Sequence, residues 1–239
     1  MLKKIILTGA NGQLGKSYIK LLLENDYKVV AVDINTDQLA EFGTDLEVTK
    51  LDITDPIAVN QLFNEHSDVY GLINNAGIGV FTPFEDRTAE EFMDVVKVNL
   101  LGTFLMCQGA IKRMKLRSEG KIVNIGSIYG VVSSDPRIYG NSRRNNSEVY
   151  SISKAGIIQL TKYLATHFGH VNIQTNSISP GGVYNRQSDD FVRNYESKTP
   201  MNRMANPEDL HSTLLFLLSA SSNYVNGQNI VVDGGFTSW

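Results

Sequence analysis

Tyr150 and Lys154 stand four residues apart in the segment Tyr150-Ser151-Ile152-Ser153-Lys154. Positions i and i+4 of a helix share one face, so we expect the Lys154 ammonium to lie near the Tyr150 hydroxyl. A positive charge beside a phenol favours the phenolate and would lower its pKa from the usual value of about 10. The pair therefore predicts a tyrosine that donates or accepts a proton near neutral pH.

A glycine-rich segment, TGANGQLG at positions 8 to 15, directly follows a short apolar run. Such a turn between a strand and a helix lets the backbone approach a pyrophosphate, whose charge is met by the N–H groups of the helix N-terminus. Glycines also serve as plain tight turns, so the pattern alone leaves that alternative open. The nucleotide contacts expected from the turn come from Gly9, Asn11, Gly12, Gln13, Leu14 and Gly15.

Asp33 ends the second apolar run, 18 residues after Gly15. A carboxylate at this point accepts hydrogen bonds from the adenosine ribose hydroxyls of NAD and repels the 2′-phosphate of NADP. No Arg or Lys occurs between Asp33 and Glu41 to bind a phosphate, so NAD is the expected cofactor. The alternative for Asp33 is a turn-forming residue at a strand end. Asp52, with Ile53 after it, ends the third run and is expected to touch the adenine.

Short β-branched runs alternate with longer segments of helical period, which predicts a parallel sheet with helices on both faces. Capping residues place three helix starts, at Asp55-Pro56, at Thr88 with Glu91, and at Asn206-Pro207. We expect one doubly wound Rossmann-type α/β domain over residues 1–239. Its seven predicted strands are Ile5 to Thr8, Lys28 to Asp33, Glu47 to Asp52, Val69 to Asn74, Lys121 to Gly126, Ile173 to Ser179 and Asn229 to Val232.

The composition excludes several classes of partner. A net charge of −3 gives no basic field for nucleic acid or an anionic membrane, and the apolar cluster Leu214 to Leu218 is far shorter than the ~20 residues of a spanning helix. The single cysteine, Cys107, fits a reducing cytoplasm, and the start MLKKIILTG reads as a strand and not as an export signal. The four histidines have no acidic or cysteine partners at ligand spacing, so no metal site is expected.

Over essentially its whole length the chain resembles the short-chain dehydrogenase/reductase family, in its compact single-domain branch. Several motifs carry the resemblance in the right order, and their number makes coincidence negligible. They are the fourth-strand motif Asn74 to Gly77, the mid-helix Asn99, Ser127 after the fifth strand, Tyr150 with Lys154, the turn Pro180 to Gly182, and the ending Val232-Asp233-Gly234-Gly235.

The resemblance implies a proton relay. Ser127 would hold the substrate oxygen, Tyr150 would donate or accept the proton, Lys154 would tune Tyr150 and grip the nicotinamide ribose, and Asn99 would position a water. The implied cofactor is NAD, and the further residues implied to contact it are Asn75, Ala76, Gly77, Pro180, Gly181 and Val183. The expected activity is NAD-dependent hydride transfer between nicotinamide and a carbinol or ketone.

Two features depart from the compact branch and are nearer to the larger nucleotide-sugar branch. The glycines follow Gly-x-x-Gly-x-x-Gly, and 23 positions separate Ser127 from Tyr150. The extra residues form an insert at about 133–148, which we expect on the substrate side together with a loop at about 182–206. Arg143 and Arg144 of the insert could clamp a phosphate or carboxylate, although a solvated loop or a subunit contact is an equal alternative. Tyr129, Tyr139, Tyr184 and Tyr195 could stack on a sugar ring, although each could equally belong to the core or the rim, and only Tyr129 is close to Ser127 in the sequence.

The insert and the segments around it are similar to those of dehydrogenases of bacterial flagellin-glycosylation and nonulosonic-acid pathways, which make legionaminic and sialic-acid-like sugars. This similarity implies an anionic sugar derivative, phosphorylated, carboxylated or nucleotide-linked, as the substrate. An epimerase or dehydratase of a nucleotide sugar, with no net redox change, is the alternative. The helices predicted from Glu90 to Arg113 and from Val149 to Gly169 carry more apolar residues than one side of a sheet needs, which predicts a homo-oligomer, a tetramer or a dimer.

Overall fold

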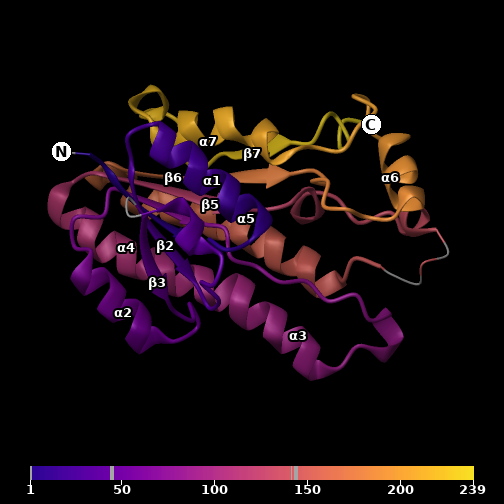
Figure 1. Ribbon diagram of the computed structural model, residues 1–239, viewed down its shortest axis with the longest axis horizontal. Helices are drawn as coiled ribbons and strands as arrows, with labels where there is room; N and C mark the ends of the chain where they lie inside the picture. The colour runs from indigo at the N-terminus through magenta and orange to yellow at the C-terminus, as the bar shows by residue number, and fades with distance from the viewer. Residues whose placement is uncertain (1, 44–45, 141, 143–144) are drawn as a thin grey trace.

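The computed structural model describes residues 2–43, 46–140, 142 and 145–239, and it is built around one parallel sheet (Figure 1). The sheet has seven strands within these residues, in the order β3-β2-β1-β4-β5-β6-β7, and this confirms the predicted fold class. The strands are β1 (Lys4–Thr8), β2 (Lys28–Asp33), β3 (Leu46–Lys50), β4 (Gly71–Asn74), β5 (Gly120–Ile125), β6 (Ile173–Pro180) and β7 (Asn229–Val232).

Strand β1 lies between β2 and β4, so the winding of the chain reverses there. Ile5 is level with Val29 of β2 on one side and with Gly71 of β4 on the other. In open parallel sheets a crevice forms at such a reversal, outside the carboxyl ends of the strands, because the following loops leave in opposite directions. The glycine turn after β1 and the segment after β4 both begin at this edge.

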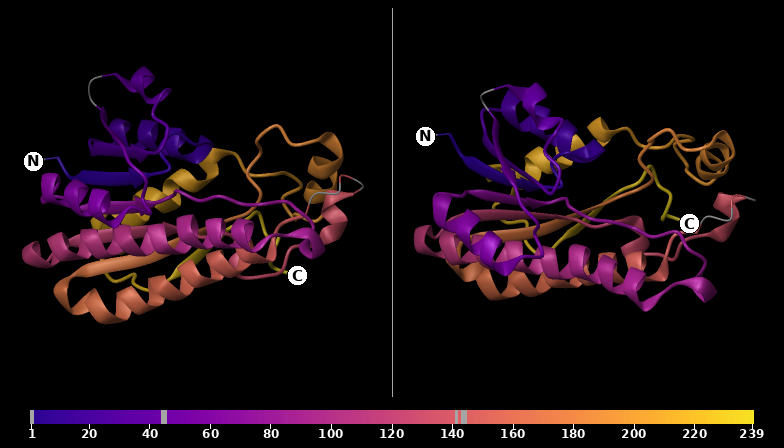
Figure 2. Two further views of the ribbon diagram at one scale, coloured as in Figure 1. Left: turned by 90° about the horizontal axis from the view of Figure 1, so that it is seen from below. Right: turned by 60° about the horizontal axis from the view of Figure 1, so that its bottom comes forward.

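Helices cover both faces of the sheet (Figure 2). Helices α1 (Gln13–Glu24) and α7 (His211–Leu218) pack on one apolar core, around Ile5, Leu7 and Leu214. Helices α2 (Pro56–Glu65), α4 (Thr103–Arg117) and α5 (Glu148–Phe168) pack on the other, around Ile6, Phe63 and Met106. The continuous apolar runs of β1 and β4 follow from this arrangement, because both sides of these strands are buried.

The predicted helix caps are present. The Asp55 carboxylate accepts from the backbone N–H groups of Ile57 and Ala58, at 2.8 and 3.1 Å, and opens α2. Thr88 and Glu91 form a reciprocal capping box that opens α3 (Ala89–Val96). Asn206 caps a 3₁₀ turn, Pro207–Leu210, which leads into α7.

The predicted helix from Glu90 to Arg113 exists, but a π-helical segment, Lys97–Gly102, divides it into α3 and α4. Gly102 lies against Ile53 in this segment, and a Cβ there would come within 2.5 Å of the Ile53 side chain. By length and composition alone the continuous helix Ala89–Arg117 could cross a membrane. However, 44% of its most apolar window is buried inside the protein, and the core helices of globular proteins meet the same two criteria.

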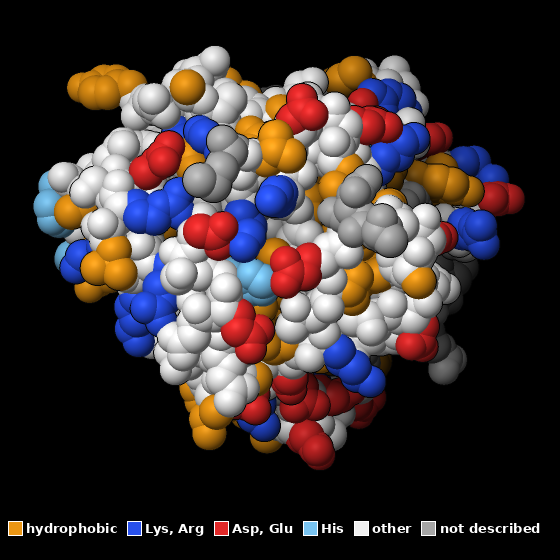
Figure 3. All heavy atoms as spheres, turned by 60° about the vertical axis from the view of Figure 1, so that its left-hand side comes forward, with side chains coloured by type: hydrophobic (Ala, Val, Ile, Leu, Met, Phe, Trp, Pro, Cys, Tyr) orange, Lys and Arg blue, Asp and Glu red, His pale blue; other side chains and the backbone are white. Residues whose placement is uncertain are grey.

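A third, smaller apolar cluster lies at the end of the molecule where α6 (Asp189–Glu196) is labelled (Figure 1). Ile138 of the insert packs there with Tyr195 of α6 and with Met204. The insert and the loop after β6 are therefore joined to each other at the carboxyl edge of the sheet. On the face shown in Figure 3, basic and acidic side chains are interspersed over most of the surface.

Candidate active site

Helix α5 places Tyr150 and Lys154 one turn apart at the carboxyl edge of the sheet. Lys154 is 4% exposed, and its Nζ donates a 2.8 Å hydrogen bond to the carbonyl oxygen of Ile125 at the end of β5. The same Nζ lies 5.6 Å from the centre of the Tyr150 ring. The i, i+4 spacing therefore brings the two side chains together as the sequence predicts.

Burial dominates the protonation of both groups. It raises the pKa of Tyr150, and a hydrogen bond with Ser127 offsets only part of that rise. The prediction that the pKa of Tyr150 is lowered is therefore wrong, because burial outweighs the neighbouring groups. Burial also lowers the pKa of Lys154, to about 8.

Ser127 follows β5 and caps the 3₁₀ turn Ile128–Gly130. Its Oγ accepts from the backbone N–H of Tyr129 at 3.1 Å, which fixes the hydroxyl at the carboxyl edge of the sheet. Ser127 is 7% exposed, and it lines the same cavity as Tyr150 and Lys154. Three of the four predicted catalytic side chains thus face one space.

Asn99 lies behind that space, in the π-helical segment, and is fully buried. Its Oδ1 accepts from the N–H of Ile78 at 2.9 Å, and its Nδ2 donates to the carbonyl oxygen of Ile78 at 3.0 Å and to Ser153 Oγ at 2.9 Å. A Cβ placed on Gly77 would lie 3.4 Å from Asn99 Oδ1 and 3.4 Å from Lys154 Nζ. Asn99 is therefore close to Lys154 without lining the cavity. The π segment, which the sequence did not predict, places it there.

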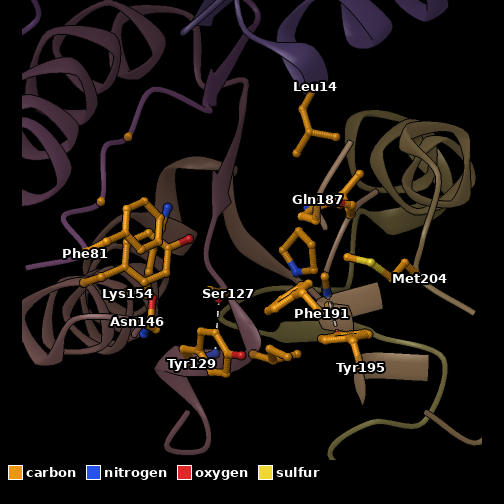
Figure 4. A pocket seen from close by; sticks show the side chains of 18 of the residues that line it. Leu14, Phe81, Ser127, Tyr129, Asn146, Lys154, Gln187, Phe191, Tyr195 and Met204 are labelled. Atoms are coloured by element: carbon orange, nitrogen blue, oxygen red, sulfur yellow. Dashed lines mark hydrogen bonds between the residues drawn. The ribbon is translucent and has the colours of Figure 1, made fainter. Parts of the chain in front are cut away.

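The cavity has a volume of about 440 Å³ (Figure 4). Phe81 and Asn146 lie with Lys154 on one side of it, and Gln187, Phe191 and Met204 lie on the other. Lys154 is its one charged lining residue among the described part of the chain. The remaining lining residues are aliphatic, aromatic or neutral and polar, which suits an uncharged molecule that has both apolar faces and hydroxyl groups.

Sequence reasoning named Tyr129, Tyr139 and Tyr195 as aromatic residues that could contact a substrate, and it missed the other residues of the cavity wall on the substrate side. Beyond Tyr129, three segments that are distant in the chain contribute aromatic rings to the wall. Two of these segments, the insert and the loop after β6, also contribute neutral polar groups. A single sequence carries no signal that these segments meet, because the meeting depends on the packing of the insert against α6. The missed residues include Phe81, Ser142, Asn146, Gln187, Ser188, Phe191 and Met204.

The expected basic clamp is not visible in the described structure. Arg143 and Arg144 lie outside the described residues. Of the other basic side chains in these loops, Arg137 and Lys198 both pair with Asp135. Tyr184 does not line the cavity: its side chain is 46% exposed, and its carbonyl oxygen accepts from Gln13 Nε2 at 2.6 Å.

The turn after β1 has the form that a dinucleotide requires. Gly9 has a φ of +63°, and a Cβ there would come within 2.7 Å of Ala76 Cα. A Cβ on Gly15 would come within 2.2 Å of the carbonyl oxygen of Gly9, so both positions need glycine. The Asn75 amide donates to that carbonyl at 2.9 Å, which ties the glycine turn to the segment after β4.

The side chain of Asn11 is a second indication that the turn binds a ligand. Its Oδ1 is buried, and no described residue donates a hydrogen bond to it. A buried polar oxygen without a donor costs free energy, so a partner outside the chain is expected there. Leu14 lines the cavity, which connects the glycine turn to the space in front of Tyr150.

Asp33 lies at the tip of β2 beside the glycine turn. Its two carboxylate oxygens accept from the N–H of Asn11 at 2.9 Å and from the N–H of Asn35 at 3.1 Å. Sequence reasoning missed Lys16, whose Nζ is hydrogen-bonded to Gln38 in the loop after Asp33. A cation therefore stands near the expected adenosine position, although it belongs to α1 and not to that loop.

The other predicted cofactor residues lie at the same edge. Asp52 accepts from the N–H and the hydroxyl of Thr54, each at 2.8 Å, so it forms a turn after β3. Gly77, Pro180, Gly181 and Val183 line the cavity. No cluster of three or more His, Cys, Asp or Glu side chains suited to a metal occurs among the described residues.

Comparisons with known proteins show which family the chain belongs to. A family model described as Enoyl-(Acyl carrier protein) reductase matches residues 9–237. The post-translational flagellin modification protein A of Campylobacter coli is 32% identical over 98% of both chains. The NADH-dependent L-xylulose reductase of Ambrosiozyma monospora is 34% identical, over 98% of this chain and 94% of the relative.

Solved structures show the same similarity. A short chain dehydrogenase from Leptospira borgpetersenii serovar Hardjo-bovis, crystallised with bound NAD⁺, superposes with a TM-score of 0.94 and 44% identity, over 99% of this chain and 93% of that one. A 4-hydroxyisoleucine dehydrogenase complexed with NADH superposes with a TM-score of 0.87 and 32% identity, over 99% of each chain. With the family model, the relatives and the tyrosine-lysine pair in agreement, the chain belongs to the short-chain dehydrogenase/reductase family of oxidoreductases that act on CH–OH groups.

Proposed function

We propose that this protein is a cytoplasmic NAD-dependent oxidoreductase that interconverts a carbinol and a ketone of a polar sugar derivative. The observation that carries the proposal is the meeting of Ser127, Tyr150 and Lys154 in one cavity that also reaches Leu14 of the glycine turn. Acid–base groups and a dinucleotide turn at one cavity are what hydride transfer to a carbonyl needs.

The glycine turn, Asn11 and Asp33 would hold NAD, which supplies or accepts the hydride when it is bound. Gly9 and Gly15 let the chain turn tightly from β1 into α1. The N–H groups at the start of α1 would then face the pyrophosphate, and the unpartnered Asn11 Oδ1 lies in the same turn. The Asp33 carboxylate would accept from the adenosine ribose hydroxyls and repel a 2′-phosphate. The similar Leptospira dehydrogenase with bound NAD⁺ and the 4-hydroxyisoleucine dehydrogenase with NADH support this choice.

In the direction of reduction, the Tyr150 hydroxyl would give its proton to the ketone oxygen. The Ser127 hydroxyl, fixed by the N–H of Tyr129, would hold that oxygen within reach of Tyr150. Burial raises the pKa of Tyr150, so the phenol stays protonated and ready to donate near neutral pH. Lys154 in its ammonium form would stabilise the resulting phenolate, and Asn99 would position a water that returns the proton.

The neutral and aromatic cavity wall supports a sugar as the substrate. Aromatic rings stack on the C–H faces of a sugar, and Asn146, Gln187 and Ser188 can exchange hydrogen bonds with its hydroxyls. The similar L-xylulose reductase and flagellin modification protein agree with this class. An anionic group on the sugar would have to reach Arg143 or Arg144, because Lys154 is the one cation among the described lining residues.

A matched pair of substrates tests both parts of the proposal. We expect net NADH oxidation with D-ribulose, and more than about tenfold higher kcat/KM with D-ribulose 5-phosphate. Arg143→Ala or Arg144→Ala should raise KM for the phosphate ester alone and leave kcat nearly unchanged, because a remote anchor binds ground and transition states alike. Equal kcat/KM values for the two compounds would show that the enzyme does not recognise an anionic group on the sugar.

An epimerase or dehydratase of a nucleotide sugar remains a second candidate because of the Gly-x-x-Gly-x-x-Gly spacing. The comparisons do not favour it, since the relatives are named as reductases and dehydrogenases. The two activities differ in net redox change. Incubation with NAD⁺ and a UDP-hexose that gave product without any NADH would support the epimerase or dehydratase.

A further inference from the structure

The segment between β4 and α3, residues 77–88, forms the wall of the cavity in front of Tyr150. Ile78, Gly79 and Phe81 line the cavity from this segment. A Cβ on Gly79 would lie 3.5 Å from Cδ2 of Tyr150, so this part of the wall lies next to the tyrosine ring. Any shift of this wall would therefore change the space available to a substrate beside the phenol.

Arg87 holds the outer end of this wall. Its side chain is only 4% exposed, and its Nε lies 2.9 and 3.1 Å from the two carboxylate oxygens of Glu148, the first residue of α5. Its Nη2 donates to the carbonyl oxygen of Thr82, within the wall itself. One guanidinium thus connects the wall to the first turn of the helix that carries Tyr150 two residues later.

A second connection lies at the inner end of the same wall. Asn99 binds both backbone groups of Ile78 and donates to Ser153 Oγ, which in turn donates to the carbonyl oxygen of Tyr150 at 2.7 Å. The wall is therefore tied to α5 at two points. Glu148 and Ser153 stand on either side of Tyr150 in the sequence, so the ties bracket the tyrosine.

Stabilisation of the fold does not by itself explain the ion pair between Arg87 and Glu148. The Arg87 side chain is buried, whereas that of Glu148 is 30% exposed. Removing a guanidinium from water costs free energy that its attraction to a partly solvated carboxylate often fails to repay. In addition, Nη1 of Arg87 is buried, and no described residue accepts a hydrogen bond from it. An apolar pair of similar size would serve stability as well, whereas only a fork of donors fixes the wall and the helix in one relative position.

We propose that Arg87 and Glu148 are positioning residues for the reaction, which hold the wall around Phe81 at a fixed distance from the Tyr150 hydroxyl. The inference rests on the proposed role of Tyr150 as the proton donor. The pair touches none of the residues assigned to NAD, so its loss acts on the proton transfer and on the substrate. Small displacements matter here because proton transfer requires the two oxygens at hydrogen-bond distance.

The test compares wild type with Arg87→Met, Arg87→Lys and the double variant Arg87→Met/Glu148→Leu. Arg113→Met is the matched control, since Arg113 also donates to a backbone carbonyl, that of Phe63, but lies away from the cavity. Turnover is followed with NADH and three carbonyl probes, L-xylulose, D-ribulose and 2,3-butanedione. Hydrogen exchange is measured in parallel on peptides that cover residues 78–88 and 147–155.

We expect kcat to fall by on the order of 10- to 100-fold in Arg87→Met and in the double variant, with NADH affinity unchanged within about twofold. Arg87→Lys keeps the charge and should recover part of kcat. Exchange should rise in both peptides together, and Arg113→Met should change neither peptide. A double variant with wild-type kcat, or faster exchange in only one of the two peptides, would overturn the inference. Wild-type enzyme that was inactive on all three probes would contradict the proposed function. The hydrogen-exchange data would still show whether Arg87 and Glu148 hold the wall and α5 together.

Discussion

Lys154 and Asn99 flank a single position beside Gly77: a Cβ placed there would lie 3.4 Å from the Nζ of one and 3.4 Å from the Oδ1 of the other. A water that passes the proton of Tyr150 onward would have to lie near this position to touch both groups.

Gly77→Ala places a methyl group at that point. The two contacts of 3.4 Å are ordinary van der Waals distances, so the variant should fold with a melting temperature near that of wild type. We expect kcat for ketone reduction to fall by about tenfold, because the methyl displaces a water from the relay. Steady-state rates and NADH affinity measured together check this, and an unchanged kcat would show that no water is needed between these residues.

Asp33 should set the choice of cofactor. We expect NAD(H) to bind at least about tenfold tighter than NADP(H), because the carboxylate repels a 2′-phosphate. Asp33→Ala should weaken NAD(H), strengthen NADP(H) and so narrow the difference. Fluorescence titration of both reduced cofactors measures it. The presence of Lys16 near Gln38 makes Lys16→Ala a useful comparison, since this variant should weaken NADP(H) more than NAD(H). Equal affinities in wild type would contradict the account.

The pH dependence of kcat/KM should report the protonation state of Lys154. Burial lowers its pKa to about 8, so in the free enzyme the ammonium is lost as the pH rises through that value. If the ammonium stabilises the Tyr150 phenolate, kcat/KM for ketone reduction should fall above about pH 8. Rates measured between pH 6 and 10 with NADH and D-ribulose test this. A flat profile up to pH 9.5 would separate Lys154 from the acid–base step.

The lowered pKa of Lys154 should also make the free energy of unfolding depend on pH. The pKa of Lys154 is lower in the folded protein than the usual 10.5, so the unfolded chain binds more protons between about pH 8 and 10.5. The burial of Lys154 is therefore most costly below pH 8, and that cost declines as the pH rises through this window. Lys154→Met should unfold at higher urea concentration than wild type at pH 7, and the difference should shrink by pH 10.

The sequence predicted the strands of the sheet to within about two residues at each end, because buried parallel strands leave continuous apolar runs such as Val29 to Val32. It also predicted the meeting of Tyr150 with Lys154, since both lie within one helix. It could not predict the direction of the Tyr150 pKa, because spacing gives the distance to a charge but not the depth of burial. The tie between Arg87 and Glu148 was invisible for a related reason: 61 residues separate its members.

The prediction of a homo-oligomer remains, with a narrower set of contact residues. Among the apolar residues of the two helices expected to meet a partner, Val95 and Ile158 are buried within the protomer, and Leu105 and Leu160 pack against its core. Leu101, Phe104 and Ile152 remain exposed on α4, α5 and the π segment. We expect light scattering at micromolar concentration to give the mass of a tetramer or a dimer, and Leu101→Glu/Ile152→Glu to give a smaller species. A wild-type monomer would contradict this.

The most direct test of the central claim is the ratio of NADH consumed to carbinol formed, measured for wild type and Tyr150→Phe with the same ketose. We predict one NADH per carbinol in wild type. In Tyr150→Phe, which removes only the proton-donating hydroxyl, we predict a loss of kcat by at least about 10² with NADH affinity unchanged within about twofold. Product formed without net NADH change, or Tyr150→Phe with more than about a tenth of the wild-type kcat, would contradict the account.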